Sequence, residues 1–229
     1  MVEKSAQKTL PLRKIQKLIG KRMMQSKRTK PCFYLEAKAD ITDLMAMRPE
    51  LKKHFGVKIT TNVFYIYTLA LAVKKFPLTV ATLDADNIKI ANNINVGFAV
   101  NAPQGLVVPV VKNADKKTLP QIAQLEKQLT ENARSNKLTL EQIEGETIAM
   151  SNLGAYGIDS FLGIVPPPVT AILAIGNVVQ KLVPIQGSIK SRKIVSLTIA
   201  ADSRIITPSY AARFLEYITE QLKNPADLI

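Results

Sequence analysis

Residues 95–111 read NVGFAVNAPQGLVVPVV. Two apolar runs, Asn95–Val100 and Leu106–Val111, stand on either side of a short segment that contains both a proline and a glycine. Apolar runs of this length are typical of buried strands, and proline with glycine between them is typical of a tight turn. The stretch therefore predicts two strands joined by the turn Ala102–Gly105.

Outside this stretch, segments with helical periodicity alternate with segments that have strand periodicity. The helices are predicted over residues 12–23, 42–53, 62–75, 118–135 and 208–222. The further strands are predicted over residues 33–41, 88–90, 147–151, 169–175 and 194–201. This order predicts an α/β (α+β) fold in which helices cover a sheet.

Size and composition limit the class of protein. The chain has 229 residues, of which 47% are hydrophobic, so it can bury a large core without disulfides or metals. Cys32 is the single cysteine, which excludes an internal disulfide and fits a reducing compartment. No apolar run reaches the 18 residues typical of a membrane helix, and no signal-peptide core is found. We expect a protein of the bacterial cytoplasm or the mitochondrial matrix, with a polar tail over residues 1–11 and one domain over residues 12–229.

The net charge of +13 comes from lysines and arginines that are spread along the chain and are densest in Arg13–Lys30, which carries eight of them. No aromatic residues are interleaved with these charges, so a platform for stacking nucleic-acid bases is not indicated. We interpret the basic residues as the solvated face of an amphipathic helix, with an anionic partner as the alternative. Neither a nucleic acid nor a membrane is expected as a partner.

Four ordered motifs extend over most of the chain. They comprise LRKI, KRM and PCFY between residues 12 and 34, NVGFAV and PQGLVVPV between 95 and 110, ADKK at 114–117, and SNLG, PP and AIL between 151 and 173. Together they resemble the C-terminal catalytic domain of dihydrolipoamide acyltransferases, the core enzymes of 2-oxo acid dehydrogenase complexes such as that of pyruvate. The resemblance implies a two-layer sandwich similar to chloramphenicol acetyltransferase, with a mixed sheet flanked by helices.

The resemblance also implies an assembly and a place for the chemistry. Family members form trimers, which build cubic or dodecahedral shells, and each active site lies between two subunits. Coenzyme A (CoA) enters from one side and the lipoyl arm from the other. We therefore expect CoA as a non-covalent ligand, no covalently bound cofactor and no metal. The lipoyl and peripheral-subunit-binding modules of the family are not found in this sequence.

Acyl transfer between thiols requires a base for the attacking thiol and a donor for the tetrahedral oxyanion. The family places these in a His-Arg-x-x-Asp-Gly motif and in a strand that ends in Ser-x-Leu/Ile-Gly. In this chain Ser203 stands at the histidine position, Thr207 at the aspartate position and Pro208 at the glycine position. A serine hydroxyl is not basic near neutral pH, so Ser203 is not expected to act as the base. The loss of a general base typically lowers the rate by about 10²–10⁴-fold.

His54 and Cys32 are the other residues that could stand in for the missing base. His54, the only histidine, is far in sequence from the motif and is interpreted as a surface or capping residue. Cys32 is interpreted as a buried, inert thiol. Ser151 is a candidate oxyanion donor, and the alternative is a strand-end hydroxyl that satisfies the following turn. Thr207 followed by proline is a favourable helix start, which indicates a remodelled site.

Three functions follow from these observations. The first is a catalytically inactive core subunit, similar to component X, the dihydrolipoamide-dehydrogenase-binding protein, which also carries serine in the histidine position. Such a subunit would form homotrimers, or mixed trimers with an active acyltransferase, within a larger shell that binds the other components of the complex. The second is an active dihydrolipoamide acyltransferase that moves an acyl group between lipoamide and CoA with a rearranged site. The third is a module that binds CoA or an acidic partner.

Overall fold

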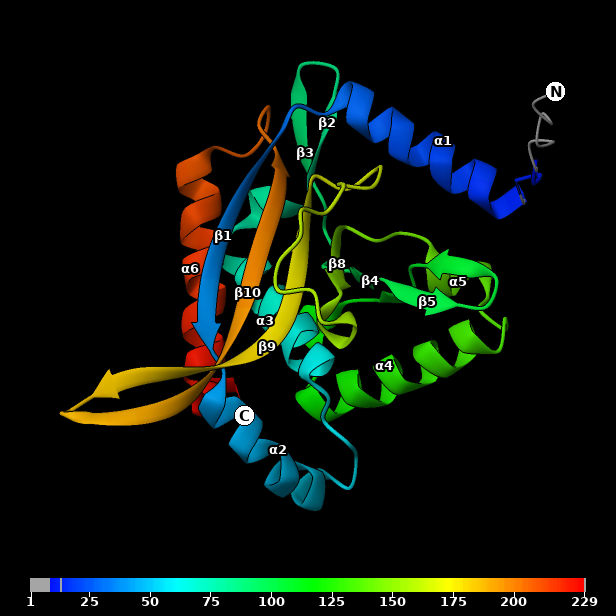
Figure 1. The fold of residues 1–229 in the computed structure, drawn as a ribbon. Coiled ribbons are helices and arrows are strands. Elements are labelled where there is room, and N and C mark those ends of the chain that lie inside the picture. The colour runs from blue at the N-terminus through cyan, green and yellow to red at the C-terminus, as the bar shows by residue number, and fades with distance from the viewer. Residues whose placement is uncertain (1–8, 13, 229) are drawn as a thin grey trace, which may run out of the picture.

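A six-stranded mixed sheet, with the strand order β1-β10-β9-β8-β4-β7, forms the centre of the chain. The computed structural model describes residues 9–12 and 14–228. β8 runs parallel to both of its neighbours, and the other pairs in this sheet are antiparallel (Figure 1). The strands are β1 (Cys32–Asp40), β4 (Val96–Phe98), β7 (Val110–Val111), β8 (Ile148–Asn152), β9 (Ala171–Ile185) and β10 (Ser188–Asp202).

Two small antiparallel pairs and several helices complete the fold. The pairs are β2 (Ala81–Asp84) with β3 (Asn87–Ile90), and β5 (Val100–Ala102) with β6 (Gly105–Val107). The helices are α1 (Lys14–Thr29), α2 (Thr42–Phe55), α3 (Thr61–Lys75), α4 (Leu119–Arg134), α5 (Leu140–Ile143) and α6 (Pro208–Lys223). Short 3-10 turns are η1 (Pro77–Val80), η2 (Ala114–Lys116), η3 (Gly154–Tyr156) and η4 (Pro225–Leu228). The prediction of a mixed sheet flanked by helices is confirmed.

The main core lies between the sheet and the helices α3 and α6 (Figure 1). α3 is apolar on nearly all sides, and its Phe64, Ile66 and Leu69 are completely buried. This is the pattern expected of a helix enclosed by other elements. A smaller cluster on the opposite face of the sheet includes Ala149 and Ile172 together with Val165 and Val169 of the loop before β9. The sheet is therefore covered by helices on one face and by a loop on the other.

The prediction of the strands around residues 95–111 was wrong in detail. Each of the two predicted strands is divided, one at Ala99 and the other at Val108–Pro109, and the turn Ala102–Gly105 joins β5 to β6. Proline has no N–H to donate to a sheet, which interrupts the second strand. The N–H of Ala99 donates to Met150 on β8 (3.0 Å), so the chain passes from one sheet to the other at this residue.

The strands β9 and β10 extend well beyond the predicted ranges of residues 169–175 and 194–201. Their outer halves form a long hairpin that projects from the molecule (Figure 1), and Leu182 and Ile189 on it are exposed. The hairpin is rich in polar and charged residues, so its sequence lacks the apolar run by which the inner halves are recognised.

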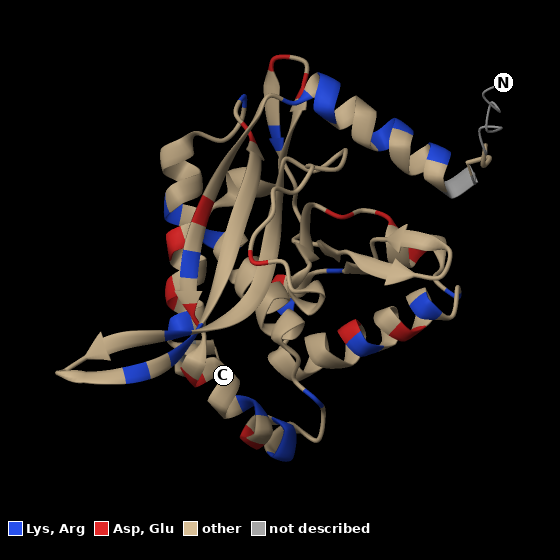
Figure 2. Cartoon of the chain, in the orientation of Figure 1, with Lys and Arg blue, Asp and Glu red and all other residues tan. Residues whose placement is uncertain are grey.

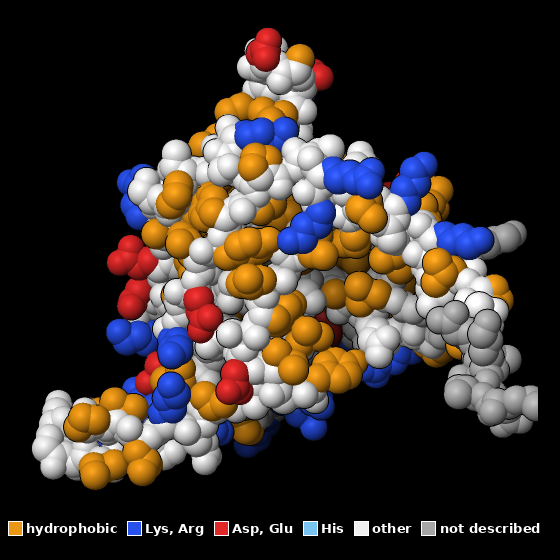
Figure 3. Space-filling model, turned by 45° about the horizontal axis from the view of Figure 1, so that its top comes forward, with side chains coloured by type: hydrophobic (Ala, Val, Ile, Leu, Met, Phe, Trp, Pro, Cys, Tyr) orange, Lys and Arg blue, Asp and Glu red, His pale blue; other side chains and the backbone are white. Residues whose placement is uncertain are grey.

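The first predicted helix is present, but it covers Lys14–Thr29 rather than residues 12–23, and its apolar side makes few contacts with the core. Leu18 and Met24 are more than half exposed, and apolar side chains gather on the face between α1 and the β2–β3 hairpin (Figure 3). Figure 2 marks the basic residues along α1, and those whose side chains are described are exposed. Arg22 also donates to the carbonyl of Pro167 (2.6 Å) and pairs with Glu146 (3.5 Å). Arg13 and most of the predicted polar tail over residues 1–11 lie outside the described residues, so the domain boundary stays a prediction.

In the part of the chain that the structure describes, every helix is too short or too polar to span a bilayer.

The packing of α6 gives a direct test of the fold. Phe214 is completely buried and its ring contacts the edge of Phe76. Replacement of Phe214 by alanine should lower the free energy of unfolding by about 3–5 kcal/mol, because it leaves a cavity in the main core. Chemical denaturation at one fixed protein concentration measures this loss. The matched control is Glu216→Ala on the exposed side of the same helix, which should change stability by less than about 0.5 kcal/mol. Equal losses for the two variants would contradict this packing.

Candidate functional site

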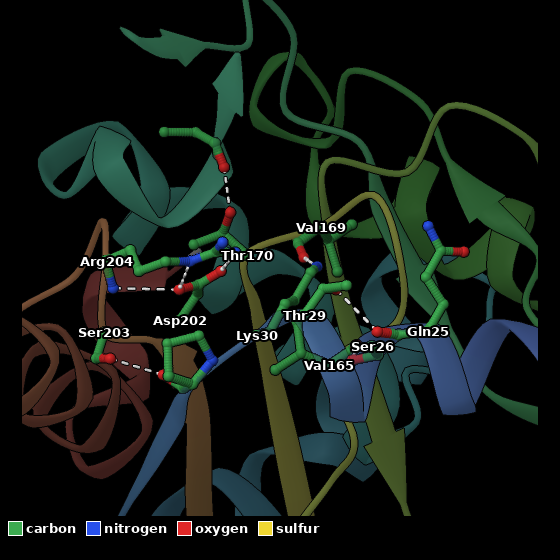
Figure 4. Close-up of polar contacts among 12 residues, drawn as sticks. Gln25, Ser26, Thr29, Lys30, Val165, Val169, Thr170, Asp202, Ser203 and Arg204 are labelled. Atoms are coloured by element: carbon green, nitrogen blue, oxygen red, sulfur yellow. Dashed lines mark hydrogen bonds and ion pairs between the residues drawn. The ribbon is translucent and has the colours of Figure 1, made fainter. Parts of the chain in front are cut away.

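Ser203 lies directly after β10, and its side chain is bound to the backbone. Its Oγ–H donates to the carbonyl oxygen of Pro31 (2.7 Å), and its N–H donates to the same oxygen (2.9 Å), as Figure 4 shows for the hydroxyl. Both bonds tie the end of β10 to the segment that links α1 to β1. Ser203 is exposed, but its single proton is already donated. The residue therefore offers neither a basic nitrogen nor a free donor in this conformation.

The residues on either side of Ser203 form an ion pair. Asp202 is buried, and its two carboxylate oxygens accept hydrogen bonds from the guanidinium of Arg204 at 2.9 and 2.6 Å (Figure 4). Burial alone would raise the pKa of Asp202, but the hydrogen bonds and charge of Arg204 outweigh it, so this pKa is lowered. Asp202 is therefore ionised at neutral pH and is occupied by its own neighbour. It is not available as a base.

Thr207 and Pro208 start helix α6. The Thr207 side chain accepts a hydrogen bond from the N–H of Tyr210 (3.3 Å), and proline occupies the first turn. The predicted cap is therefore confirmed. An N-cap hydroxyl followed by proline is a favourable helix start, because it satisfies a free N–H and uses the fixed proline backbone. The roles of Ser203 and Thr207 as counterparts of catalytic residues stay predictions.

A lysine and a cysteine lie near this segment. Lys30 donates to the carbonyl oxygens of Pro166 (3.4 Å) and Val169. Burial lowers its pKa, against the opposing effect of Asp202. Cys32 is half-buried rather than fully buried, and burial together with the negative charge of Asp202 raises the pKa of its thiol. A raised thiol pKa disfavours the reactive thiolate, which agrees with the interpretation of Cys32 as inert.

Ser151 occupies a different part of the molecule. Side chains alternate along β8, so Ser151 shares a face with Ala149 of the smaller cluster, whereas Met150 and Asn152 face the helices. A cavity of about 400 Å³ adjoins the end of this strand. Its lining combines apolar with hydrogen-bonding side chains, among them Phe98, Leu106, Leu153, Asn62, Thr130, Arg134 and Tyr156. Such a mixture suits a flexible ligand that carries amide groups.

A chain of part-buried polar side chains borders the same cavity. The side-chain N–H of Asn152 donates to the Oδ1 of Asn62 (2.8 Å), and the Oδ1 of Asn152 accepts from the N–H of Gly154 (2.9 Å). Asn62 in turn is hydrogen-bonded to Glu126, a buried carboxyl group on α4. The predicted sites did not include these residues. A carboxylate within the apolar stripe of the helix (Leu119, Ile122, Ala123, Leu129) was the signal that the sequence offered.

The sheet keeps Ser151 and Ser203 apart within one chain. In the sheet, Ser151 is paired with Ala174 on β9. The N–H of Asp202, the residue before Ser203, donates to the carbonyl oxygen of Thr170, just before β9 begins. The offset is about 13 Å along the strands, and two strand spacings of together about 10 Å separate them across the sheet. A single subunit therefore does not bring the two residues into one reaction site.

His54 does not replace the missing histidine in this conformation. It is exposed in the last turn of α2, which follows the Asp40 end of β1, whereas Ser203 lies at the Cys32 end. The two ends of this strand are roughly 26 Å apart. Its ring contacts Phe55 (4.7 Å between centroids), which agrees with the interpretation of a surface residue.

Comparison with known proteins now settles the family. The model of the family 2-oxoacid dehydrogenases acyltransferase (catalytic domain) matches residues 4–229. The chain belongs to this family. A dihydrolipoyllysine-residue acetyltransferase component of pyruvate dehydrogenase complex from Rickettsia bellii is 34% identical over 94% of this chain and 53% of its own length. The mitochondrial pyruvate dehydrogenase protein X component of Mus musculus is 32% identical over 96% of this chain and 44% of its own length. The chain thus spans about half the length of the curated relatives it matches.

Solved structures agree with the family and the fold. Two of them are each 28% identical to this chain, with a TM-score of 0.93. Each match covers 99% of this chain and 96% of the chain in the solved structure. One is the dihydrolipoamide acetyltransferase of Azotobacter vinelandii, studied for the role of a serine, a histidine and an asparagine in its catalytic mechanism. The other is the cubic core of a pyruvate dehydrogenase multienzyme complex. A chloramphenicol acetyltransferase has a TM-score of 0.55 at 11% identity, covering 89% of this chain and 94% of its own, which confirms the predicted fold.

The ion pair beside Ser203 makes the stability depend on pH. The folded pKa of Asp202 is lowered, so its stabilising effect is present above the unfolded value of about 3.9 and is lost as the pH falls through the folded value. Replacement of Asp202 by asparagine should cost about 1–2 kcal/mol at pH 7, because Arg204 is partly solvated, and should remove this part of the acid dependence. Thermal unfolding from pH 7 down to pH 3 measures both effects.

The control for this variant is Asp84→Asn, which removes an ion pair to Lys89 in which both side chains are more than half exposed. It should change stability by less than about 1 kcal/mol. If Asp202→Asn kept the acid dependence of the wild type, the lowered pKa would be refuted.

Proposed function

We propose that this chain is a core-forming subunit of a pyruvate-type 2-oxo acid dehydrogenase complex that has the acyltransferase fold but lacks its own acyl-transfer chemistry. The observation that carries the proposal is the state of Ser203. At the position of the family's histidine stands a hydroxyl, and its proton is donated to the Pro31 carbonyl. Without a basic nitrogen there, the attacking thiol keeps its proton and reacts slowly.

Sequence spacing supports the assignment of the positions. The serine, histidine and asparagine investigated in the Azotobacter vinelandii enzyme follow one another at intervals of 52 and 4 positions. Ser151, Ser203 and Thr207 follow at the same intervals. The third residue of that enzyme is an amide, so a carboxylate at the position of Thr207 is not essential to the comparison. The replacement of the histidine therefore carries more of the argument than the replacement at Thr207.

The proposed assembly is a homotrimer, or a mixed trimer with an active acyltransferase, within a larger shell that binds the other components of the complex. The relatives support this kind of complex, since one is a protein X component and one solved structure is a cubic core. The chain itself offers exposed apolar surface on α1 and on residues 156–164. Surface of this kind is typical of contacts between subunits.

CoA is the proposed non-covalent ligand. The cavity beside Ser151 offers amide and hydroxyl groups between apolar walls, which supports a pantetheine-like chain. The cavity is lined by residues from α3, α4, β5 and β8, and Ser203 does not contribute to it. The CoA half of the site is thus supported as intact, and the loss of chemistry is confined to the half around Ser203.

A second role rests on this intact half. In a mixed trimer, Ser151 and its cavity would complete the site of a neighbour that supplies the histidine. The separation of Ser151 from Ser203 within one chain favours this role, because it fits a site shared between subunits. A fully active homomeric enzyme has less support: its base would have to come from elsewhere, and His54 lies far from Ser203 in the chain.

Restoring the family motif tests the first proposal. The purified wild-type chain should transfer acetyl groups from acetyl-CoA to dihydrolipoamide at a rate near background. The combined variant Ser203→His, Thr207→Asp and Pro208→Gly should be faster by about 10²–10⁴-fold, the usual effect of a general base. Asp202 and Arg204 remain in place to support the new histidine, and aspartate retains the N-cap of α6.

The control is Ser203→Ala, which removes the hydroxyl that binds Pro31. It should leave the wild-type rate unchanged, because no catalytic group is lost. If the wild type were already as fast as the restored variant, the chain would be an active acyltransferase and the proposal would fail.

Mixed trimers test the second role. The wild-type chain is combined with an active relative whose own Ser151 counterpart is replaced by alanine. Activity should appear only in the mixture, and it should fall by about 10²–10³-fold when Ser151 of this chain is also changed to alanine, the usual effect of losing an oxyanion donor. The assay is acetyl transfer at several mixing ratios. Activity that only falls with the dose of this chain, regardless of Ser151→Ala, would exclude the complementation.

A further inference from the structure

Glu126 is a buried carboxyl group that the proposed chemistry does not use. It lies on the inner side of α4, with 8% of its surface exposed. It contributes to the walls of two adjoining cavities, the one beside Ser151 and a second of about 390 Å³ that also includes Thr60 and Asn177. Asn62 and Asn152 line both cavities as well. Burial of a carboxyl group is costly unless the group is paired or hydrogen-bonded.

The partners of Glu126 form a directional chain of hydrogen bonds. The Oδ1 of Asn62 accepts from Asn152 (2.8 Å), so the amide nitrogen of Asn62 is the group that can donate to Glu126. Thr130 donates a second, longer bond to the carboxyl (3.5 Å). At the other end, Asn152 accepts from the N–H of Gly154 (2.9 Å). The chain therefore runs from α4 through α3 to the turn that follows Ser151.

The backbone of this turn is packed closely against neighbouring backbone. A Cβ at Gly154 would come within 2.5 Å of the carbonyl oxygen of Gly176, and a Cβ at Gly176 would come within 1.8 Å of the carbonyl oxygen of Asp159. The N–H of Leu153 also donates to Ile175 on β9 (3.0 Å). The position of the turn is thus fixed by backbone contacts on one side. On the other side, the amide of Asn152 holds it.

The charge state of Glu126 is sensitive to its surroundings. Burial raises the pKa of this carboxyl, and the hydrogen bonds from Asn62 and Thr130 and the charges of Arg134 and Lys58 oppose the rise without cancelling it. Among the residues that line the two cavities, the other titratable side chains are Arg134 and the phenols Tyr65 and Tyr156. Burial raises the pKa of Tyr65, so this phenol stays neutral.

The ionised and neutral forms support different arrangements. A carboxylate only accepts hydrogen bonds, so it holds the amide nitrogen of Asn62 toward itself and leaves the Oδ1 of Asn62 for Asn152. A protonated carboxyl can donate to that Oδ1, which competes with Asn152 and lets the amide of Asn62 turn over. We infer that Glu126 is a positioning residue: through Asn62 and Asn152 its charge sets the order of the turn that follows Ser151. For acyl transfer the inference rests on the proposed function, but the relay itself does not.

Hydrogen exchange measured by mass spectrometry tests the relay on the intact assembly. After correction for intrinsic exchange rates, amides in residues 151–157 of the wild type should become several-fold less protected between pH 8 and pH 4.5, because the raised pKa of Glu126 lies above the lower limit. Glu126→Gln should remove this pH dependence, because glutamine keeps the shape and does not titrate. The matched control is Glu131→Gln on the exposed side of α4, which should behave as the wild type.

A second arm adds CoA at pH 8 and records the protection of the same residues. Protection by CoA supports the proposed ligand, and its absence refutes that ligand without bearing on the relay. The relay is refuted if the wild type shows no dependence on pH, or if Glu126→Gln retains it. The circular dichroism spectrum and the thermal midpoint of each variant confirm that it is folded before exchange is compared.

Discussion

The pairing of β8, β9 and β10 in one sheet fixes the distance between Ser151 and Ser203 within the chain. Hydrogen bonds fix β8 and β10 on either side of β9 with a defined register, so the ends that carry Ser151 and Ser203 are held apart. A rigid sheet does not bend enough to join them. Any reaction that needs both positions therefore needs two subunits, and in the proposed assembly each subunit would present two separate half-sites. It follows that one half can be lost while the other persists.

The two halves differ in how they are built. Around Ser203 the polar groups are satisfied within the chain: Asp202 binds Arg204, the Ser203 hydroxyl binds Pro31 and Thr207 caps α6. These contacts stabilise the ends of secondary structure and leave no free base. Around Ser151, by contrast, a cavity remains, and the hydroxyl makes no hydrogen bond to another described residue. The first half has the character of a structural joint, and the second keeps the character of a binding site.

Much of this could be predicted from the sequence, and the exceptions have physical reasons. The apolar periodicity of α3, α4 and α6 and the cap at Thr207 are local properties, and they were predicted closely. The outer halves of β9 and β10 were not, because a solvated hairpin has no buried side to give it an apolar pattern. The bond from Ser203 to Pro31 joins residues far apart in the chain and could not be foreseen. Glu126 did leave a signal, an acidic residue on the apolar stripe of a helix, which gains meaning only once Asn62 is seen opposite it.

We propose that the protein retains the CoA half of the site and has lost the base. Two measurements on one preparation of the wild-type chain test this proposal: calorimetric titration of CoA, and acetyl transfer from acetyl-CoA to dihydrolipoamide. CoA should bind while transfer stays near background. Turnover well above background that falls on Ser151→Ala in the homomeric protein would show a working base and refute the proposal.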